Sequence, residues 1–518
     1  MNITPLTPLT DLHICTNLDF SSNYENVIEF KDRQAQLNYF NSKTLYTFEK
    51  ITPVKLYNSI SVPLEADKLI TASYMFFRNA NFSGEWMFAF ITDIQYVNPN
   101  NSVITYEIDS YQTYQFRMQI KSCFIERETV DNDAIGNHLI DEGLDTGEIV
   151  TYYQNTLPEL KPSAVLVGAT VNSDLTPAGA EFSGNVFSGI HLIPFDLDTD
   201  VQALKSFIKR AESQKAGSII GMVQMPKKFA HASLNDGLVT MTKSFDKHYN
   251  NLDGYVPENN KLFCYPYNFL NVSNNNGVDA NFKYEFFNST SCGFELTGTK
   301  SLTPEIIMYP KSYKMGAGST IDELFNFEEK LVLNGFPTCA WTSDAYLAYL
   351  AQNSIPTMVQ GAGSVASSVV GNLLTGNVLG AVTGGVGSAL NTALNAFSEG
   401  YKEYIKPPQA HGTTNTSANY ARGIQNFTVT KKGITHWYAK RLDKFFKMYG
   451  YKVNYIGTPN LKSRTRFNYV KTSNCQIYGS IPNEDIVKLQ SMFDNGIRIW
   501  HETINIGNYN LPNPIIKR

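Results

Sequence analysis

The sequence predicts a mainly β, multi-domain fold with barrel-like or sandwich-like domains, short helices and one long hydrophobic insertion. Its 518 residues suffice for about three or four domains at roughly 100–200 residues each. Aromatic residues make up 13% of the chain and charged residues only 17%, which favours half-buried strands over disorder. Apolar and polar residues alternate clearly between residues 69 and 128, whereas helical periodicity is confined to short stretches.

The expected strands come first along the chain. We place them over Leu69–Phe77, Trp86–Val97 and Ser102–Phe116, the last two flanking the turn Asn98–Asn101. Period-two alternation on both sides of a Pro/Asn turn is typical of a hairpin in which each strand buries one face.

Three short amphipathic helices are expected further along. The first opens with the capping pattern Thr199–Gln202, and the third begins at a capping Asn483 and ends at Gly496. The second ends at Gly450. The residues expected on the buried faces of the first two helices are Val201, Leu204, Ile208 and Ala211, and then Trp437, Phe445 and Tyr449.

Charge is distributed unevenly along the chain. Residues 1–150 contain 20 acidic and 10 basic side chains, whereas residues 431–471 contain 11 basic side chains and only Asp443 as an acid. Two such stretches suit a contact between subunits of an assembly or a folded contact within one subunit, and both interpretations stay open. Aromatic residues interleave the basic stretch, as in single-strand nucleic-acid binders, but a helix with exposed lysines explains the pattern better.

The most unusual feature of the sequence is a long stretch without charge. The 54 residues between Asp344 and Glu399 contain no charged side chain, although a charged content of 17% would place about nine there. The centre divides into two halves of roughly 18–20 residues, each about long enough to cross a bilayer core. The two halves meet at Thr375-Gly376-Asn377, which is typical of a turn.

Small residues recur at four-residue spacing in both halves, a pattern that lets helices approach closely in lipid. They are Gly363, Ser367 and Gly371, followed by Gly380, Gly384 and Ser388. Because lipid offers the backbone no hydrogen-bond partner, insertion would drive such a segment to form helices. Composition alone also fits a flexible linker or a small-residue hairpin buried in a subunit contact.

The candidate membrane-inserting residues are the apolar and small residues of these two halves. They are Val359, Gly363, Val365, Val369, Val370, Gly371, Leu373, Leu374, Gly376, Val378, Leu379, Gly380, Val382, Gly384, Val386, Leu390, Leu394 and Phe397.

No pattern in the sequence indicates an enzyme, a cofactor or a metal site. The six cysteines lie far apart without a CxxC pair and are expected to be isolated buried thiols. The stretch Asp131–Glu142 resembles a calcium loop, but Ile135 cannot supply the fifth-position oxygen, so we expect a solvated acidic turn. The eight histidines form no metal-binding or catalytic motif. The N-terminus lacks a signal-peptide pattern, so we expect synthesis in a cytoplasm.

Four stretches resemble one protein family. They are Leu442–Asn454 with Pro459, Asn460, Arg464, Arg466 and Phe467–Thr472; Asn26–Phe40; Trp86–Tyr111; and Phe124–Val130. The chain is similar here to the tail knob proteins, also called distal tail tube or major tail proteins, of phi29-like short-tailed phages of Gram-positive bacteria.

The resemblance implies a virion protein whose six copies form a hollow cylinder at the distal end of the tail. It implies an N-terminal β tube domain (1–130), central β-rich knob domains (131–345), a hydrophobic membrane-active loop (355–405) and a C-terminal β/α domain returning to the tube (406–518). In the family, the loops plug the tube and then enter the host membrane as a channel for DNA ejection.

The partners implied by the resemblance are further copies of the chain, the proximal tail tube or lower collar protein, a tail-tip cell-wall-degrading protein, the host cytoplasmic membrane and the genomic DNA in the lumen. The expected location is the virion tail, and the host membrane during entry. The alternative is a purely structural tube or adaptor, or a host-surface-binding tail protein, without membrane insertion.

Overall fold

The computed structural model describes residues 9–16, 18–51, 58–79, 84–175, 181–183, 186–188, 190–214, 218–232, 239–313, 330–340 and 426–516. They form two compact units, each built from separate stretches of the chain. Unit 1 takes its residues from 1–147, 254–262 and 436–518, and unit 2 from 148–253 and 263–435. Both units are rich in strands and contain few helices, which confirms the predicted fold class.

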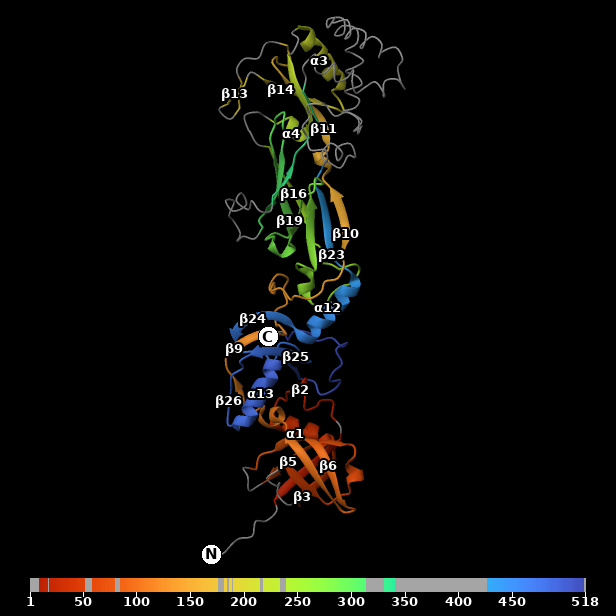
Figure 1. The fold of residues 1–518 in the computed structure, drawn as a ribbon, viewed down its shortest axis with the longest axis vertical. Coiled ribbons are helices and arrows are strands. Elements are labelled where there is room, and N and C mark those ends of the chain that lie inside the picture. Colours follow the sequence, from red (N-terminus) through yellow and green to blue (C-terminus); the bar gives the residue numbers. More distant parts are fainter. Residues whose placement is uncertain are drawn as a thin grey trace. The chain divides into compact units, whose positions relative to one another are not determined.

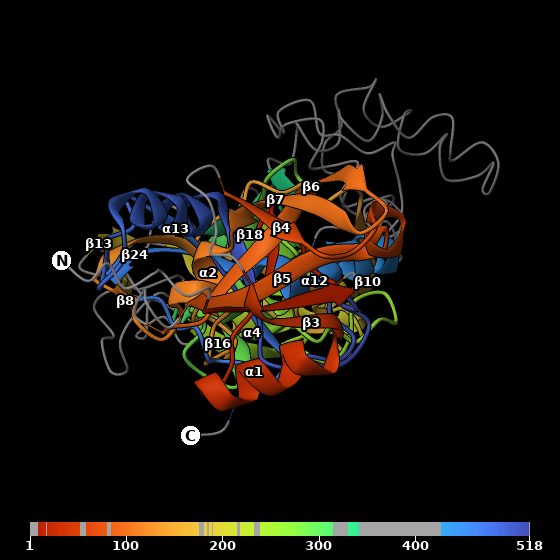
Figure 2. The same cartoon turned by 90° about the horizontal axis from the view of Figure 1, so that it is seen from below.

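The first sheet of unit 1 is antiparallel, with six strands in the order β3-β1-β5-β6-β7-β4. Figure 1 labels β3, β5 and β6 of this sheet. Successive side chains alternate between two cores: Met75 of β5 packs on one face and Tyr74 on the other. Helix α1 lies along the second face (Figure 2), where its Phe40 ring stacks on Tyr74 with the ring centroids 5.2 Å apart. The elements are β1 (Thr10–Thr16), α1 (Arg33–Ser42), β3 (Thr44–Ile51), β4 (Ser59–Val62), the 3₁₀ turn η1 (Ala66–Leu69), β5 (Ala72–Asn79), β6 (Met87–Asn98) and β7 (Asn101–Ile108).

The predicted hairpin is confirmed, but its second strand is shorter than expected. Asn98 pairs with Asn101 across the turn between β6 and β7. The expectation of a strand as far as Phe116 is wrong, because β7 ends at Ile108 and helix α2 (Ser110–Tyr114) follows. Asp109 caps this helix by accepting a hydrogen bond of 3.0 Å from the Gln112 amide, and this capping outweighs the alternating pattern.

The second sheet of unit 1 joins the two ends of the chain. Its order is β2-β27-β25-β9-β24, with β2 and β27 parallel and the other pairs antiparallel. Helix α13 packs on it and shares its core. The elements are β2 (Asn26–Ile28), β8 (Gln119–Ile120), β9 (Cys123–Glu128), α12 (His436–Tyr449), β24 (Tyr451–Gly457), β25 (Phe467–Ser473), β26 (Ile477–Tyr478), α13 (Asn483–Asn495) and β27 (Ile497–Trp500), with β8 and β26 forming a separate two-stranded ribbon.

The described residues of unit 2 form three four-stranded sheets, ordered β10-β23-β17-β18, β16-β19-β20-β21 and β14-β11-β15-β22, and the ribbon β12-β13. The three sheets contribute to one large apolar core, and helix α3 covers the opposite face of the last sheet. The elements are β10 (Ile149–Thr156), η2 (Pro158–Leu160), β11 (Pro162–Ala169), β12 (Glu181–Ser183), β13 (Val186–Ser188), β14 (His191–Asp196), α3 (Val201–Gln214), β15 (Ile219–Pro226), α4 (Lys227–Ala230), β16 (Val239–Asp246), β17 (Asn268–Ser273), β18 (Asp279–Phe282), η5 (Tyr284–Phe286), β19 (Ser291–Gly298), β20 (Ile306–Lys311), β21 (Leu331–Leu333), β22 (Thr338–Ala340) and β23 (Thr428–Ile434); η4 (Asn260–Phe263) spans the boundary between the units.

The three predicted helices are present as α3, α12 and α13. Leu204 and Ile208 of α3 are fully buried, as their spacing predicts. The residue that caps α13 is Pro482 and makes no side-chain capping bond, so the expected cap at Asn483 is wrong. As predicted, the helix stops at Gly496, whose φ is 93°. Glycine adopts a positive φ at little energetic cost, because it has no Cβ.

A substitution at the end of α12 tests the packing of unit 1. Gly450 has φ of 63°, and an added Cβ would lie 2.1 Å from the Glu128 carbonyl oxygen. We expect Gly450→Ala to lower the free energy of unfolding by about 2–4 kcal/mol. The matched control is Gly254→Ala, where φ is 82° and no atom lies within 4 Å, so backbone strain alone should cost about 1 kcal/mol. Equal losses in calorimetric unfolding would contradict the close approach.

A second prediction concerns Asp109, which is almost fully buried and accepts a 2.8 Å hydrogen bond from the Tyr74 hydroxyl. Burial raises the pKa of Asp109 to about 6, above its value in the unfolded chain. The native state therefore binds the proton first as pH falls. Relative to Asp109→Asn, which cannot titrate, the wild type should gain about 2 kcal/mol of unfolding free energy between pH 7 and pH 4.5. Urea unfolding of both proteins at the two pH values measures this gain, and a constant difference would refute it.

Candidate functional site

The predicted membrane-inserting residues, from Val359 to Phe397, lie outside the described residues. In the part of the chain that the structure describes, no helix is both long and apolar enough to cross a membrane. Insertion therefore stays a prediction. The described residues show which contacts stabilise the folded part of the chain, and where the charged side chains of that part lie.

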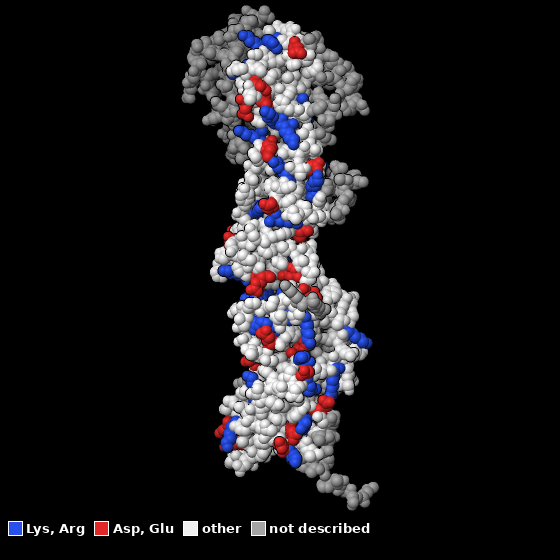
Figure 3. Space-filling model, turned by 180° about the vertical axis from the view of Figure 1, so that it is seen from behind, with Lys and Arg blue, Asp and Glu red and all other residues white. Residues whose placement is uncertain are grey.

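Part of the charge asymmetry of the sequence is resolved by ion pairs within one chain. The Lys471 ammonium lies 2.7 Å from a Glu126 carboxylate oxygen, and the Lys462 ammonium lies 3.0 Å from Glu29. Figure 3 shows Lys and Arg lying beside Asp and Glu in small mixed clusters on the visible face. Exposed pairs of this kind contribute only about 0–1 kcal/mol each. These pairs favour the folded contact within one subunit.

Helix α12 exposes three basic residues of this stretch, Lys440, Arg441 and Lys444. Its buried side chains are Ala439, Leu442, Asp443 and Phe446, spaced as one helical stripe. The expectation that Trp437 is buried is wrong, because it lies two residues before this stripe, about 200° around the helix, and is 74% exposed.

Four aromatic residues of the basic stretch give no support to its interpretation as a single-strand binder. Phe446, Tyr451, Phe467 and Tyr469 are all buried. Rings packed in a core cannot stack on bases, which such binders require. These four rings therefore reflect packing within unit 1, whereas Trp437 and Tyr455 are exposed.

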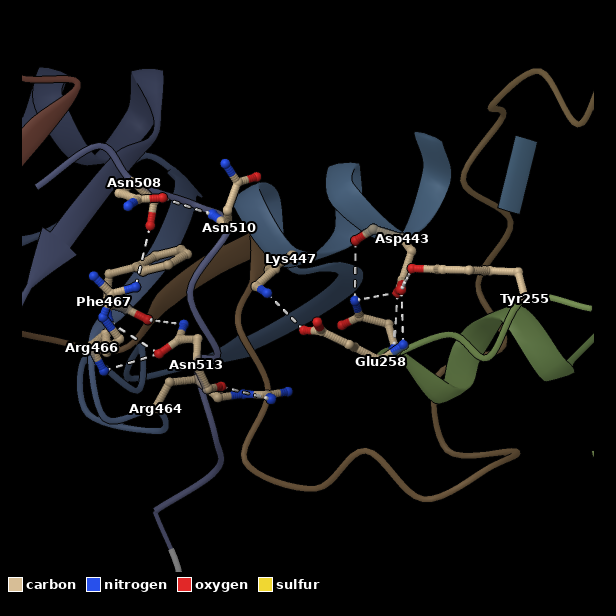
Figure 4. Close-up of polar contacts among 11 residues, drawn as sticks. Tyr255, Glu258, Asp443, Lys447, Arg464, Arg466, Phe467, Asn508, Asn510 and Asn513 are labelled. Atoms are coloured by element: carbon tan, nitrogen blue, oxygen red, sulfur yellow. Dashed lines mark hydrogen bonds and ion pairs between the residues drawn. The ribbon is translucent and has the colours of Figure 1, made fainter. Parts of the chain in front are cut away.

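Asp443, the only acidic residue of the basic stretch, organises a buried polar cluster (Figure 4). Its carboxylate accepts hydrogen bonds from the Tyr255 hydroxyl at 2.6 Å, the Glu258 amide at 2.8 Å, and the Asn259 amide and side-chain nitrogens at 3.0 and 2.7 Å. Asp443 is only 4% exposed, so these donors replace its hydration. The carboxylate thereby fastens residues 254–262, which we call the anchor segment, to α12.

The calcium-like stretch supplies two further buried carboxylates. Asp133 accepts from the Tyr451 hydroxyl at 2.6 Å and from the Asn260 amide at 3.0 Å. Burial raises the pKa of Asp133, and these hydrogen bonds oppose the rise. The second of these carboxylates is that of Glu142. Because the side chains of Asp133 and Glu142 are both buried and bonded to protein groups, the expected solvated acidic turn is only partly correct.

Glu142 balances two cations in the same region of unit 1. Its fully buried carboxylate pairs with Arg127 and Lys261 and accepts a 3.0 Å hydrogen bond from the Lys452 amide. Lys261 belongs to the anchor segment and is itself buried. Removing one partner of such a pair leaves an uncompensated buried charge, which costs about 3–5 kcal/mol.

Residues near the C-terminus complete this region of unit 1. The Asn513 side chain accepts a 2.9 Å hydrogen bond from the Arg466 amide and donates one of 2.8 Å to the Phe467 carbonyl (Figure 4). A cavity of about 320 Å³ lies between this segment, the anchor segment and α12. It is lined by Thr129, Val130, Glu258, Asn259, Phe446, Lys447, Gly450, Tyr451, Arg464 and Pro512–Pro514.

The chemistry of this region is structural. Among the residues that the structure describes, no group of three or more His, Cys, Asp and Glu could hold a metal ion. The sequence contained signals for these residues, namely a carboxylate-rich loop and a single acid among bases. Their partners in the anchor segment could not be found, because that segment carries no motif.

Comparison with known proteins identifies the family. Residues 229–514 match the model for the C-terminal domain of tail knob protein gp9 of Bacillus phage phi29, and residues 8–119 match the N-terminus of caudoviral major tail proteins. The chain is 26% identical to tail knob protein gp9 of phage phi29 and 27% identical to that of Bacillus phage PZA, over 98% of both chains in each case.

The same fold occurs in a solved structure, the tail knob protein gp12 of bacteriophage C1. The TM-score is 0.64 at 14% identity, covering 98% of this chain and 100% of that chain. The names of all these relatives describe a part of the phage tail and no enzymatic activity. Because the gp9 model matches more than half of the 518 residues, the chain belongs to the phi29 tail knob protein family and is a structural component of a short-tailed phage virion.

Proposed function

We propose that six copies of this tail knob protein form the distal tube of the tail, and that residues 355–405 plug the tube and then insert into the host membrane as a channel for DNA ejection. The observation that carries the proposal is the run of 54 residues without a charged side chain. A charged residue at a bilayer centre costs about 2.5–3.5 kcal/mol or more, so its absence removes the main barrier to insertion.

Composition also explains how such a segment can be stored in water. Gly, Ser, Thr and Asn interrupt its aliphatic residues, so it is less apolar than a permanent transmembrane helix. Copies sheltering one another in the bore would keep the apolar side chains from water. Once released, the segment would gain hydrophobic burial, about 25 cal/mol per Å² of apolar surface, together with internal backbone hydrogen bonds.

The folded flanks suit a segment that must move while its ends stay attached. The described strands on either side in sequence are β22, which pairs with β15, and β23, which pairs with both β10 and β17. These strands belong to two different sheets of unit 2. Both strands are held by pairing within unit 2.

A channel for duplex DNA requires several copies. Two helical segments from each of six copies, packed through the faces of Gly363, Ser367 and Gly371 and of Gly380, Gly384 and Ser388, could line an opening that one copy cannot. The proposed partners are the proximal tail tube or lower collar protein, the tail-tip cell-wall-degrading protein, the host cytoplasmic membrane and the genomic DNA. The rival is a structural tube, adaptor or host-surface-binding protein whose uncharged segment never meets lipid.

Liposome leakage tests the insertion step. Full-length protein added to dye-loaded vesicles should release the dye, and Gly380→Asp combined with Gly384→Asp should reduce release at least tenfold, because two charges would enter hydrocarbon. The matched control adds two charges on an exposed hairpin, Gln95→Glu with Asn100→Asp, and should leak like the wild type. Undiminished leakage of the Gly380/Gly384 variant would contradict the proposed membrane insertion. A wild-type protein that assembles but releases no dye would contradict it as well.

A further inference from the structure

Two cysteines that lie far apart in the sequence meet in the core of unit 1. Cys123 is 6% exposed and Cys475 is 2% exposed, and both belong to the same apolar core. Burial raises the pKa of both thiols, and an interaction between the two side chains contributes to each pKa. The expectation of isolated buried thiols is therefore right about burial and wrong about isolation for this pair.

Strand register brings the two residues together. Cys123 begins β9, whose partner β25 aligns Ser473 with Phe124. The chain then continues beside the same neighbour, since the Lys121 amide donates to the Gln476 carbonyl at 2.9 Å. This register places Cys123 opposite Asn474 and Cys475 opposite Ser122, so the two cysteines are diagonal neighbours on adjacent stretches of chain, which lie about 4.8 Å apart where they pair.

The position of Cys475 is fixed from two sides. The preceding residue, Asn474, has φ of 56°, which breaks the alternation of the strand. The Cys475 amide donates a 3.1 Å hydrogen bond to the Asp494 carboxylate, which also accepts one of 2.7 Å from the Thr472 hydroxyl. The thiol is therefore held next to Cys123 by the backbone and not by its own rotamer alone.

We propose that Cys123 and Cys475 form a disulfide bond when the protein is exposed to an oxidising medium, and that this bond ties together the first and last stretches of unit 1. A virion protein meets such a medium when the particle leaves the reducing cytoplasm. This proposal rests on the fold alone and is independent of membrane insertion.

The reaction is thiol–disulfide exchange with a small-molecule disulfide as oxidant. The Cys123 thiolate attacks one sulfur of the oxidant, breaks its S–S bond and releases one thiolate. The Cys475 thiolate then attacks the Cys123 sulfur of the mixed disulfide and expels the second thiolate. The two cysteine thiols are oxidised, the small disulfide is reduced to two thiols, and the two cysteine protons pass to these products.

The oxidant can reach the two cysteines from the exposed residues that flank them, next to the short ribbon of β8 and β26. Lys121, Ser122, Asn474 and Gln476 are all exposed and flank the two cysteines. Beyond them, β8 and β26 pair through only two residues each, so local opening there breaks few hydrogen bonds. Cys123, the more exposed thiol, is the one that the oxidant should reach first.

Burial makes the reaction slow at neutral pH. It raises the pKa of Cys475 to about 12 and also raises the pKa of Cys123. The thiols are therefore protonated and unreactive in the closed fold. Because exchange requires the thiolate, the rate of disulfide formation should increase with pH, up to roughly tenfold per unit.

The bond would close an unusually long loop. All of unit 2 lies between the two cysteines in the sequence. Cross-linking such distant residues removes many conformations from the unfolded chain, although the gain increases only slowly with loop length. In the folded state both residues already lie in one core, on adjacent stretches of chain.

Peptide mapping tests the pairing. Folded full-length protein is incubated with glutathione disulfide at pH 8, quenched in acid, alkylated and digested with trypsin without reduction. Cleavage after Lys121, Arg127, Lys471 and Lys488 should give peptide 122–127 linked to peptide 472–488. This product should exceed every other cysteine pairing at least tenfold, and the preference should disappear when the chain is oxidised in urea. Recovery of both peptides unlinked, carrying alkyl groups or glutathione, would overturn the proposal.

Matched variants separate the bond from general oxidation. Cys475→Ser should abolish the linked peptide, whereas Cys15→Ser, which changes a buried thiol elsewhere in unit 1, should retain it. Oxidation should raise the melting temperature of the wild type by about 5–10 °C and leave that of Cys475→Ser unchanged. A linked protein that melts like the reduced one would refute the stapling role.

Discussion

Pairing between strands from opposite ends of the chain is the constraint on which unit 1 depends. β9 has its partners β24 and β25 near the C-terminus, and β2 pairs with β27. The first 147 residues can therefore complete only one of their two large sheets by themselves. Contacts between such distant residues form late, because loop-closure entropy must be overcome before they contribute. The second sheet thus has to wait until the last residues of the chain are available.

Buried carboxylates hold the places where the chain returns to unit 1. Asp443, Asp133 and Glu142 each use donors from the anchor segment, so a short stretch that interrupts unit 2 is fixed by polar contacts and not by a large apolar surface. A buried polar group is stabilising only if all its partners are present. This requirement gives the anchor segment one register on α12, whereas an apolar contact would tolerate sliding.

The proposed insertion contrasts with this scaffold. Several charges of unit 1 are paired, among them Lys471 with Glu126 and the buried Lys261 with Glu142, whereas the stretch between Asp344 and Glu399 contains no charge. A scaffold held by matched charges is specific to one geometry in water, while an uncharged segment can change its surroundings without breaking ion pairs.

The sequence by itself determined the fold class, the hairpin around Asn98–Asn101, the helices that became α3, α12 and α13, and the uncharged insertion, because alternation, capping and composition are local properties of the chain. Only the tertiary structure decided that β7 stops at Ile108, that Trp437 faces solvent, which acids bind the anchor segment, and that Cys123 adjoins Cys475. Each of these features depends on which distant residues become neighbours. The register between strands from opposite ends of a long chain cannot be deduced from the local sequence of either end.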